Sequence, residues 1–482
     1  MNALTPDIID KLKTAAGNGG WIEDAEGKAP YLTDERDLYH GDTALVLRPN
    51  STKAVAEIVL ICNEAEIGLV PQGGNTGYCG GSIPEADGSQ IVLSLSRLNQ
   101  IRAIDPANNT MTVEAGCVLA NIQAAAEDAD RLFPLSLGAE GSCQIGGNLA
   151  TNAGGVQVLR YGNARDLVLG LEVVLPNGRV LDGLRGLRKD NTGYDLKQLF
   201  LGAEGTLGII TAAVLKLYPR PRQVVTVFTA LADVRAAVSL LARLRDNAEG
   251  VTAFEILNRA CLDLVCGHID GARDPFAEPH AWYALIEISA NRDDGGVRDG
   301  LETVLGEAME ASEVEDAVIA ASGQQAQDLW RLRETIPEAQ KRAGGCIKHD
   351  ISVPISRVAD FIDRATHRSE ADIDGVRVIA FGHIGDGNIH FNLTQPTGGD
   401  ADAFQAHTET LCPAIHDIAV ALGGSFSAEH GIGVLKKPEL ERYKSAVELD
   451  LMALVKGAID PKNIMNPGKV VTGKTNTPEG AA

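Results

Sequence analysis

The fold of this chain is decided first by residues 70–82, which read VPQGGNTGYCGGS. A strand-like run, Gly68–Gln72, leads into this stretch, and five of its thirteen residues are glycine. Successive glycine amides with no side chains in the way can form a backbone nest that binds a pyrophosphate. Taken alone, the stretch fits a surface turn better than a ligand-binding loop, so its meaning depends on the rest of the chain.

Two more glycine-rich clusters change that balance. Residues 134–155 read PLSLGAEGSCQIGGNLATNAGG, and residues 187–197, LRKDNTGYDLK, are followed by LGAEGTLGII at 201–210. Three such clusters in one domain exceed what turns require, and they favour a bound nucleotide. The chain has no G-x-G-x-x-G motif, so a Rossmann site has no support and glycine must cradle the nucleotide in another way.

Bulk properties restrict the class of protein further. A chain of 482 residues predicts two or three domains. The net charge of −22 argues against nucleic-acid binding, which needs clustered Lys and Arg, but it is compatible with an anionic substrate. The eight scattered cysteines fit reduced thiols. No apolar window is long enough for a transmembrane segment, and the N-terminal residues read as an amphipathic helix without the apolar core of a signal peptide, so we expect a cytoplasmic protein.

The pattern of strands and helices changes near residue 220. Before it, strand-like runs are separated by glycine-rich turns, at Gly68–Gln72, Ile91–Leu95, Thr110–Ala115, Leu169–Leu175 and Leu207–Leu217. The two prolines of residues 218–222, YPRPR, favour an extended linker. After it, strand-like runs alternate with helical stretches, at Val224–Ala230, Leu231–Asp246, Ala281–Ser289, Gly323–Arg342, Val376–Ile384 and Ala401–Leu422. We expect a first domain at 1–222, a second of helices on an antiparallel sheet at 223–425, and a C-terminal segment, 426–482, that returns to the first domain.

A histidine motif in the second half suggests a metal site. Residues 381–393 read FGHIGDGNIHFNL, in which Asp386-Gly387 is a strong hairpin signal. Folding about that dipeptide predicts His383 directly opposite His390, on one face with Asn392, and two such imidazoles suit a transition metal. A single strand histidine is more often a core or surface residue, but the pair favours a ligand role.

Two other segments complete the candidate chemistry. Residues 427–433 read SAEHGIG, whose glycines allow the turn that Glu429 and His430 need to face one site. Residues 329–338 read LWRLRETIPE, a helix that Pro337 should kink by removing the hydrogen bond to the carbonyl of Arg333.

The three glycine clusters, in this order and spacing, resemble the vanillyl-alcohol oxidase and p-cresol methylhydroxylase superfamily. Within it, the chain is most similar to the FAD-linked D-2-hydroxyglutarate and D-lactate dehydrogenases, from about residue 45 to 470. The resemblance implies an α+β fold: a p-cresol methylhydroxylase-type FAD-binding domain plus an α/β substrate (cap) domain with an antiparallel sheet.

The resemblance also assigns the cofactor. It implies FAD, which is held non-covalently because the first loop has no histidine where some members tether the flavin. The residues it implicates in FAD binding are Pro71, Gly73, Gly74, Asn75, Thr76, Gly77, Gly80, Ser82, Gly138, Gly141, Ser142, Gly146, Asn148, Thr151, Asn152, Gly155, Glu204, Gly205, Ile210 and Asn466.

The same resemblance gives roles to the remaining motifs. His383, His390 and Glu429 would bind a divalent metal such as zinc, and His430 would be the catalytic base. Arg333, Lys348, Asn392 and His430 would bind the substrate. The family uses a threonine where this chain has Pro337, and that departure leaves the length of the substrate open.

The expected reaction is oxidation of a D-2-hydroxy acid, D-2-hydroxyglutarate first, by hydride transfer to flavin N5. D-lactate or another short D-2-hydroxy acid is the alternative substrate. A non-redox flavin transferase of the same superfamily and a non-catalytic metal or nucleotide binder are the alternative classes. The electron acceptor would be an electron-transfer flavoprotein or a quinone, and a homodimer is left open.

Overall fold

The computed structural model describes residues 4–247, 250–292 and 294–471. The chain divides into two compact units. The first comprises Met1–Gly154, Asn163–Pro219 and Glu429–Ala482, and the second comprises Gly155–Gly162 and Arg220–Ala428.

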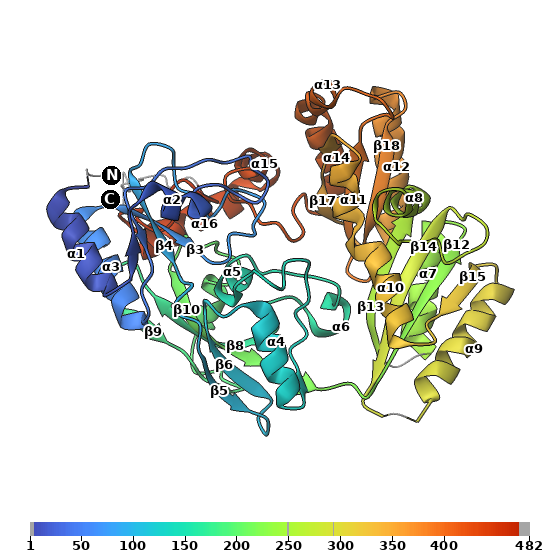
Figure 1. Ribbon diagram of the computed structural model, residues 1–482, viewed down its shortest axis with the longest axis horizontal. Coiled ribbons are helices and arrows are strands. Elements are labelled where there is room, and N and C mark those ends of the chain that lie inside the picture. The colour runs from blue at the N-terminus through green and yellow to red at the C-terminus, as the bar shows by residue number, and fades with distance from the viewer. Residues whose placement is uncertain (1–3, 248–249, 293, 472–482) are drawn as a thin grey trace. The chain divides into compact units, whose positions relative to one another are not determined.

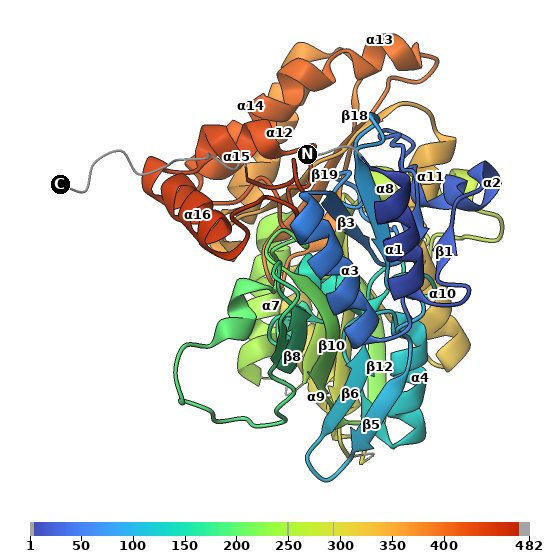
Figure 2. The same ribbon diagram turned by 90° about the vertical axis from the view of Figure 1, so that its left-hand side faces the viewer.

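The first unit begins with a four-stranded sheet. Its strand order is β1 (Trp21–Ile22), β2 (Val46–Leu47), β4 (Gln90–Ser94) and β3 (Gly68–Gln72). Both β2 and β3 run parallel to β4, and helix α3 (Thr52–Ala65) connects them as a β-α-β crossover. The Ser51 hydroxyl caps α3 by accepting from the Ala54 amide. Helix α1 (Pro6–Ala16) packs beside α3 (Figure 2).

A five-stranded antiparallel sheet completes the first unit. Its order is β5 (Ile101–Asp105), β6 (Thr110–Glu114), β10 (Ile209–Lys216), β8 (Val168–Val174) and β9 (Val180–Asp182). The first unit also contains the helices α4 (Leu119–Asp128), α5 (Ile145–Ala150), α15 (Lys437–Tyr443) and α16 (Ala446–Ile459). The C-terminal segment joins this unit through β3, because the Leu69 amide donates to the Ile464 carbonyl and the Asn466 amide donates to the Leu69 carbonyl.

The second unit is built on one antiparallel sheet of eight strands (Figure 1). The order is β15 (Val314–Ile319), β12 (Gln223–Leu231), β14 (Trp282–Ala290), β13 (Val251–Asn258), β18 (Arg377–His383), β19 (Asn388–Thr394) and β16 (Cys346–Ile347), with β17 (Asp350–Ser352) also paired to β19. The antiparallel sheet expected for this half of the chain is confirmed.

Both faces of this sheet are covered, because successive side chains along a strand point into two different apolar cores, one on each face. On β14, Ala284, Ile286 and Ile288 enter one core, and Tyr283 and Leu285 enter the other. The first core contains α7 (Val234–Asn247), α9 (Gly296–Glu310), α12 (Val358–Asp372) and α14 (Thr408–Ala421). The second contains α8 (Arg259–His268), α10 (Gly323–Glu334) and α11 (Ile336–Arg342).

The helix predicted over 323–342 is broken where Pro337 requires it. Helix α10 ends at Glu334, and α11 starts at Ile336 with Pro337 in its first turn. The stretch predicted over 401–422 is likewise two helices, α13 (Ala401–Gln405) and α14. Among the described residues, no helix combines the length and the apolar character needed to cross a bilayer.

Candidate active site

The histidine hairpin of β18 and β19 has a different register from the one predicted. His383 pairs with Asn388, and His390 pairs with Phe381, so the two histidines are not directly opposite. Residues 384–387 form the loop between the two strands, so the observed register differs from the predicted one by two residues. A slip of two keeps every side chain on its face. His383 and His390 are therefore diagonal neighbours, with ring centroids 5.7 Å apart.

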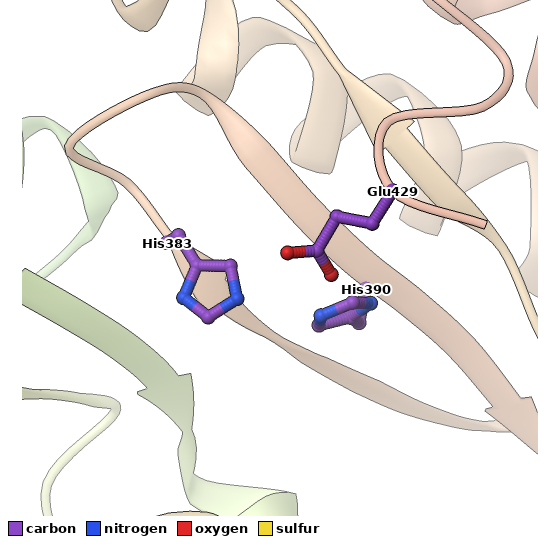
Figure 3. Close-up of side chains that lie close together, drawn as sticks. All are labelled: His383, His390 and Glu429. Atoms are coloured by element: carbon purple, nitrogen blue, oxygen red, sulfur yellow. The ribbon is translucent and has the colours of Figure 1, made fainter. Parts of the chain in front are cut away.

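The predicted metal ligands lie together. One ligand atom each from His383, His390 and Glu429 fall within 4.8 Å of one another, and Figure 3 shows the three side chains turned toward a common point. Glu429 is the first residue after Ala428, whose amide donates to the Asp350 carbonyl in the second unit. Two imidazoles and a carboxylate form the kind of donor set that holds zinc with one position left open.

Each imidazole has a buried carboxylate behind it. Glu255 Oε1 lies 2.5 Å from His383 Nδ1, and Asp350 Oδ1 lies 3.9 Å from His390 Nδ1. The Glu255 carboxylate is within hydrogen-bond distance and favours a proton on His383 Nδ1, so Nε2 would be the atom of His383 that binds a cation, whereas Asp350 is too far from His390 for a hydrogen bond. Burial alone would raise the pKa of Glu255, but His383 and Arg333 beside it hold that pKa at about 2. This arrangement fits a metal site.

Arg333 shares the carboxylate of Glu255. Its Nε donates to Glu255 Oε2 at 2.8 Å, and its guanidinium lies over the Phe381 ring, 4.6 Å from the centroid. Arg333 is 7% exposed, so it is not a solvated surface arginine. The Nη atoms remain available for a carboxylate ligand.

The other predicted substrate residues differ in how many of their polar atoms already form hydrogen bonds within the protein. Asn392 donates to Gln340 Oε1 at 2.8 Å and accepts from the His349 amide at 3.2 Å, which leaves one Nδ2 hydrogen. Lys348 is exposed between β16 and β17 and has no ion-pair partner among the residues that the structure describes.

Sequence reasoning missed Glu255 because it missed strand β13. The signal was present in residues 251–258, VTAFEILN, where one acidic residue interrupts an apolar run. A glutamate inside a buried strand must be paired, so it points to a partner elsewhere in the chain.

His430 lies in the first unit beside the first glycine-rich loop. Its ring meets Tyr78 edge to face, with centroids 4.9 Å apart. The turn that follows is held by Glu204, whose carboxylate accepts from the amides of Ile432 and Gly433 at 2.7 and 2.8 Å. Burial raises the pKa of Glu204, and those two amides partly offset the shift.

The three glycine clusters meet at the carboxyl end of β3. A Cβ on Gly74 would lie 2.2 Å from the Ser142 carbonyl oxygen, which joins the first cluster to the second. A Cβ on Gly205 would lie 2.5 Å from the Pro71 ring, which joins the third cluster to the first. A backbone contact therefore accounts for Gly74, and contact with a proline ring accounts for Gly205, without a ligand.

Several of the predicted FAD residues support the loops themselves. Asn75 donates to the Thr33 carbonyl and accepts from the Ser82 hydroxyl at 2.8 Å each. Asn152 accepts from the Arg165 amide at 2.9 Å, and Asn466 donates to the carbonyls of Gly81 and Glu204.

The remaining predicted residues are distributed over loops and element ends. Thr76 and Gly80 lie in the first loop, Gly146, Asn148 and Thr151 at or just after α5, Ile210 at a bulge of β10, and Gly155 in the short segment that belongs to the second unit.

Other features of the three glycine-rich clusters are compatible with a bound cofactor. A Cβ on Gly73 would make ordinary van der Waals contacts of 3.5 Å or more, and at Gly77, Gly138 and Gly141 a Cβ would meet nothing within 4 Å, so packing does not explain those glycines. Asn148 Oδ1 is buried without a hydrogen-bond partner among the described residues. An unpaired buried acceptor suits the hydroxyl and imide donors of a flavin nucleotide.

Comparison with known proteins also indicates that the chain binds FAD. A family model described as "FAD binding domain" matches residues 43–183, and one described as "FAD linked oxidases, C-terminal domain" matches residues 220–470. The fold is similar to the solved structure of p-cresol methylhydroxylase, with a TM-score of 0.75 at 16% identity over 96% of each chain. The predicted α+β fold is thereby confirmed, and the class of protein is a FAD-linked oxidoreductase.

Closer relatives narrow this class. The D-2-hydroxyglutarate dehydrogenase of Arabidopsis thaliana is 39% identical over 98% of this chain and 82% of its own. The enzyme of that name from Danio rerio is 40% identical over 99% and 85%. A D-2-hydroxyglutarate–pyruvate transhydrogenase of Saccharomyces cerevisiae is 35% identical over 92% and 90%. The chain belongs to the D-2-hydroxyglutarate dehydrogenase family of FAD-dependent dehydrogenases.

The expectation of a cytoplasmic protein is wrong. The Arabidopsis thaliana and Danio rerio relatives are both named as mitochondrial, which contradicts that expectation. The error lay in drawing a location from the lack of an apolar leader, because such a lack does not distinguish one compartment from another.

Proposed function

We propose that this protein oxidises D-2-hydroxyglutarate to 2-oxoglutarate, with FAD as the hydride acceptor. The observation that supports this most is the grouping of His383, His390 and Glu429 within 4.8 Å. Arg333 is held by the same buried glutamate as His383, so a site for a cation and a site for a carboxylate lie on one sheet face.

In this proposal the first unit is the FAD-binding domain, and residues 223–425 are the substrate domain. The three glycine clusters hold FAD without a covalent link, since residues 70–82 contain no histidine. When bound, FAD supplies the electron acceptor for the hydride from C2 of the substrate.

His383, His390 and Glu429 would hold a divalent metal, for which zinc fits the donor set. Such an ion would polarise the 2-hydroxyl and the neighbouring carboxylate as a Lewis acid. This requires His383 to keep its proton on Nδ1, which the contact with Glu255 favours.

The chain's own residues would then orient the substrate and move its proton. His430, as a neutral imidazole, accepts the proton of the 2-hydroxyl. Its edge-to-face contact with Tyr78 and the Glu204 anchor after it restrict where the ring can point. The Nη groups of Arg333 grip the distal carboxylate, with Lys348 as a second cation.

One residue supports a second candidate substrate. Pro337 lies in the first turn of α11, four residues after Arg333, where the family pattern has a threonine hydroxyl. Without that donor the distal carboxylate has one partner fewer, and D-lactate or another short D-2-hydroxy acid becomes the alternative. For the electron acceptor we propose an electron-transfer flavoprotein or a quinone. The yeast relative is named for pyruvate instead.

Anaerobic flavin bleaching tests the proposal. The holoenzyme is mixed without oxygen with D- and L-2-hydroxyglutarate and with D- and L-lactate, and flavin absorbance is followed by stopped flow. We expect D-2-hydroxyglutarate to bleach the flavin fastest and both L-enantiomers to leave it oxidised. Fastest bleaching by D-lactate would favour the second candidate, and no bleaching by any hydroxy acid would favour a transferase.

A further inference from the structure

We propose that Glu255 is the positioning residue that sets both the metal ligand His383 and the substrate-binding Arg333, an inference that rests on the function proposed above. Glu255 lies in the middle of β13, with a side chain that is 0% exposed. Its two carboxylate oxygens are divided between two donors, Oε1 to His383 Nδ1 and Oε2 to Arg333 Nε.

The contact with His383 determines which imidazole nitrogen can bind a cation. Glu255 and His383 are directly paired across β13 and β18, so their side chains stand on the same face of the sheet. A carboxylate only accepts hydrogen bonds, and it therefore holds the imidazole proton on Nδ1. Nε2 is then left unprotonated as the ligand atom.

The contact with Arg333 determines how the guanidinium is presented. Using Nε for Glu255 leaves the two Nη groups as a planar fork. The fork is restrained from one side by the ring of Phe381, which stands two residues before His383 on β18. One carboxylate thus fixes the metal ligand and the cation that would grip the far end of the substrate.

A neighbouring glutamate provides a matched control. Glu287 on β14 is half-buried, and it also holds helix α10, by accepting from Trp330 Nε1 at 3.2 Å. Its other partner is the Thr252 hydroxyl at 3.1 Å, and neither partner has a role in the proposed chemistry. The substitution Glu287→Gln therefore tests the general effect of changing a partly buried acid under α10.

The substitution Glu255→Gln separates the two contacts. A carboxamide has one acceptor oxygen, and the permanently charged Arg333 should take it because charge-assisted hydrogen bonds are stronger. The amide NH2 then faces His383 and moves the imidazole proton to Nε2. Glu255→Leu, of similar volume, removes both contacts.

The experiment measures zinc affinity by competition with a chromogenic chelator, and substrate preference as the ratio of kcat/KM for D-2-hydroxyglutarate to that for D-lactate at saturating zinc. We expect Glu255→Gln to bind zinc roughly 10- to 100-fold more weakly, with FAD content and the substrate ratio close to wild type. Glu255→Leu should lose zinc affinity as well and lower the substrate ratio at least about tenfold. Glu287→Gln should leave both quantities within about twofold, because removing a contact outside the site should change neither measurement.

Zinc affinity in Glu255→Gln equal to wild type would overturn the proposal, as would an unchanged substrate ratio in Glu255→Leu. Equal losses in Glu287→Gln would also overturn it, since they would make Glu255 a general structural residue. If Glu255→Leu fails to fold, the zinc measurement on Glu255→Gln decides. A wild-type protein that binds no zinc and is not bleached by D-2-hydroxy acids would instead refute the proposed function, before any variant is measured.

Discussion

At the scale of single residues, the site is governed by which hydrogen-bonding atoms are already occupied. Arg333 and Asn392 were both predicted to bind substrate, but each has part of its donor set taken by the protein. What remains, two Nη groups and one Nδ2 hydrogen, limits the directions from which a ligand can be held. Occupied atoms also explain why a buried arginine is tolerated here, since Glu255 neutralises it.

Arg333→Ala should weaken the reaction with D-2-hydroxyglutarate far more than that with D-lactate, which has no distal carboxylate. Loss of a charge-assisted contact costs about 1.5–3 kcal/mol, or about ten- to a hundredfold in kcat/KM. Steady-state kinetics with both substrates checks this. Arg331→Ala is the control, because Arg331 is exposed on the same helix and its side chain donates to the Asp270 carbonyl, away from Glu255. Equal losses with both substrates would show that Arg333 serves the shared carboxylate or the fold.

His383→Ala should remove bound metal and most of the activity while FAD stays bound. The reason is that His383 lies in the second unit, whereas nearly all of the predicted FAD residues lie in the first. Metal analysis and the flavin spectrum of the purified variant give the two measurements. His367→Ala, on the exposed side of α12, should change neither. Full metal content in His383→Ala would refute the assignment.

At the scale of elements, turns decide where the chemical groups point. The β18–β19 loop needs Gly387, which has φ +82° and whose added Cβ would lie 2.0 Å from the Val353 carbonyl oxygen. Likewise, the Glu204 carboxylate anchors the turn after His430. In both places the side chains proposed for the chemistry lie close in sequence to a turn that is held by specific contacts.

Gly387→Ala should destabilise the protein more than Gly398→Ala. Both glycines have left-handed backbone, at φ +82° and +76°, so each alanine costs about 1–2 kcal/mol from the conformation alone. Only Gly387 adds a steric clash, since a Cβ on Gly398 meets nothing within 4 Å. Thermal unfolding should therefore give a lower Tm for Gly387→Ala, together with weaker zinc binding. Equal Tm values would mean that the loop relaxes around the clash.

Glu204→Gln distinguishes two roles for that residue. If Glu204 positions the His430 turn, the variant keeps its FAD and loses kcat, because a single carboxamide oxygen replaces two acceptors for two amides. An unsatisfied buried amide costs about 1–3 kcal/mol, so we expect roughly a tenfold lower kcat. Loss of flavin on gel filtration, with normal kcat for the flavin-loaded fraction, would make Glu204 a cofactor residue instead.

At the scale of the whole molecule, nearly all of the residues predicted for FAD lie in the first unit, and Glu255, Arg333 and His383 lie in the second. Segments distant in sequence complete the first unit, since residues 464–466 bond to the edge of β3 at Leu69. In the second unit, Glu255, Arg333 and His383 lie between the sheet and the helices α8, α10 and α11. The low dielectric of such an interior strengthens the interactions between their charges.

Precipitation with acid should release all of the yellow colour into the supernatant. In the proposed function the three glycine clusters hold FAD without a covalent link, and residues 70–82 offer no histidine for a covalent tether. The absorbance of the supernatant and the pellet gives the partition directly. Flavin that stays with the precipitated chain would contradict non-covalent binding.

The sequence by itself determined the local features of this protein. Strands β3, β6, β8 and β10 were predicted within one or two residues, because apolar runs bounded by glycine turns act over a few positions. The break at Pro337 and the hairpin at Asp386-Gly387 are equally local, since ring geometry and turn preference depend on immediate neighbours. The shared face of His383 and His390 followed from the two-residue period of a strand.

Only the tertiary structure decided the register of that hairpin and the partners of its side chains. In the observed register Gly387 lies against Val353, whose amide donates to the Gly387 carbonyl, and turn preference does not contain that contact. The Glu255 carboxylate meets Arg333 and His383 across 78 and 128 residues of sequence, in a strand that was not predicted. A buried charge shows that it has a partner, but strand order brings His383 to Glu255 and the packing of α10 on the sheet brings Arg333, and no local pattern encodes either.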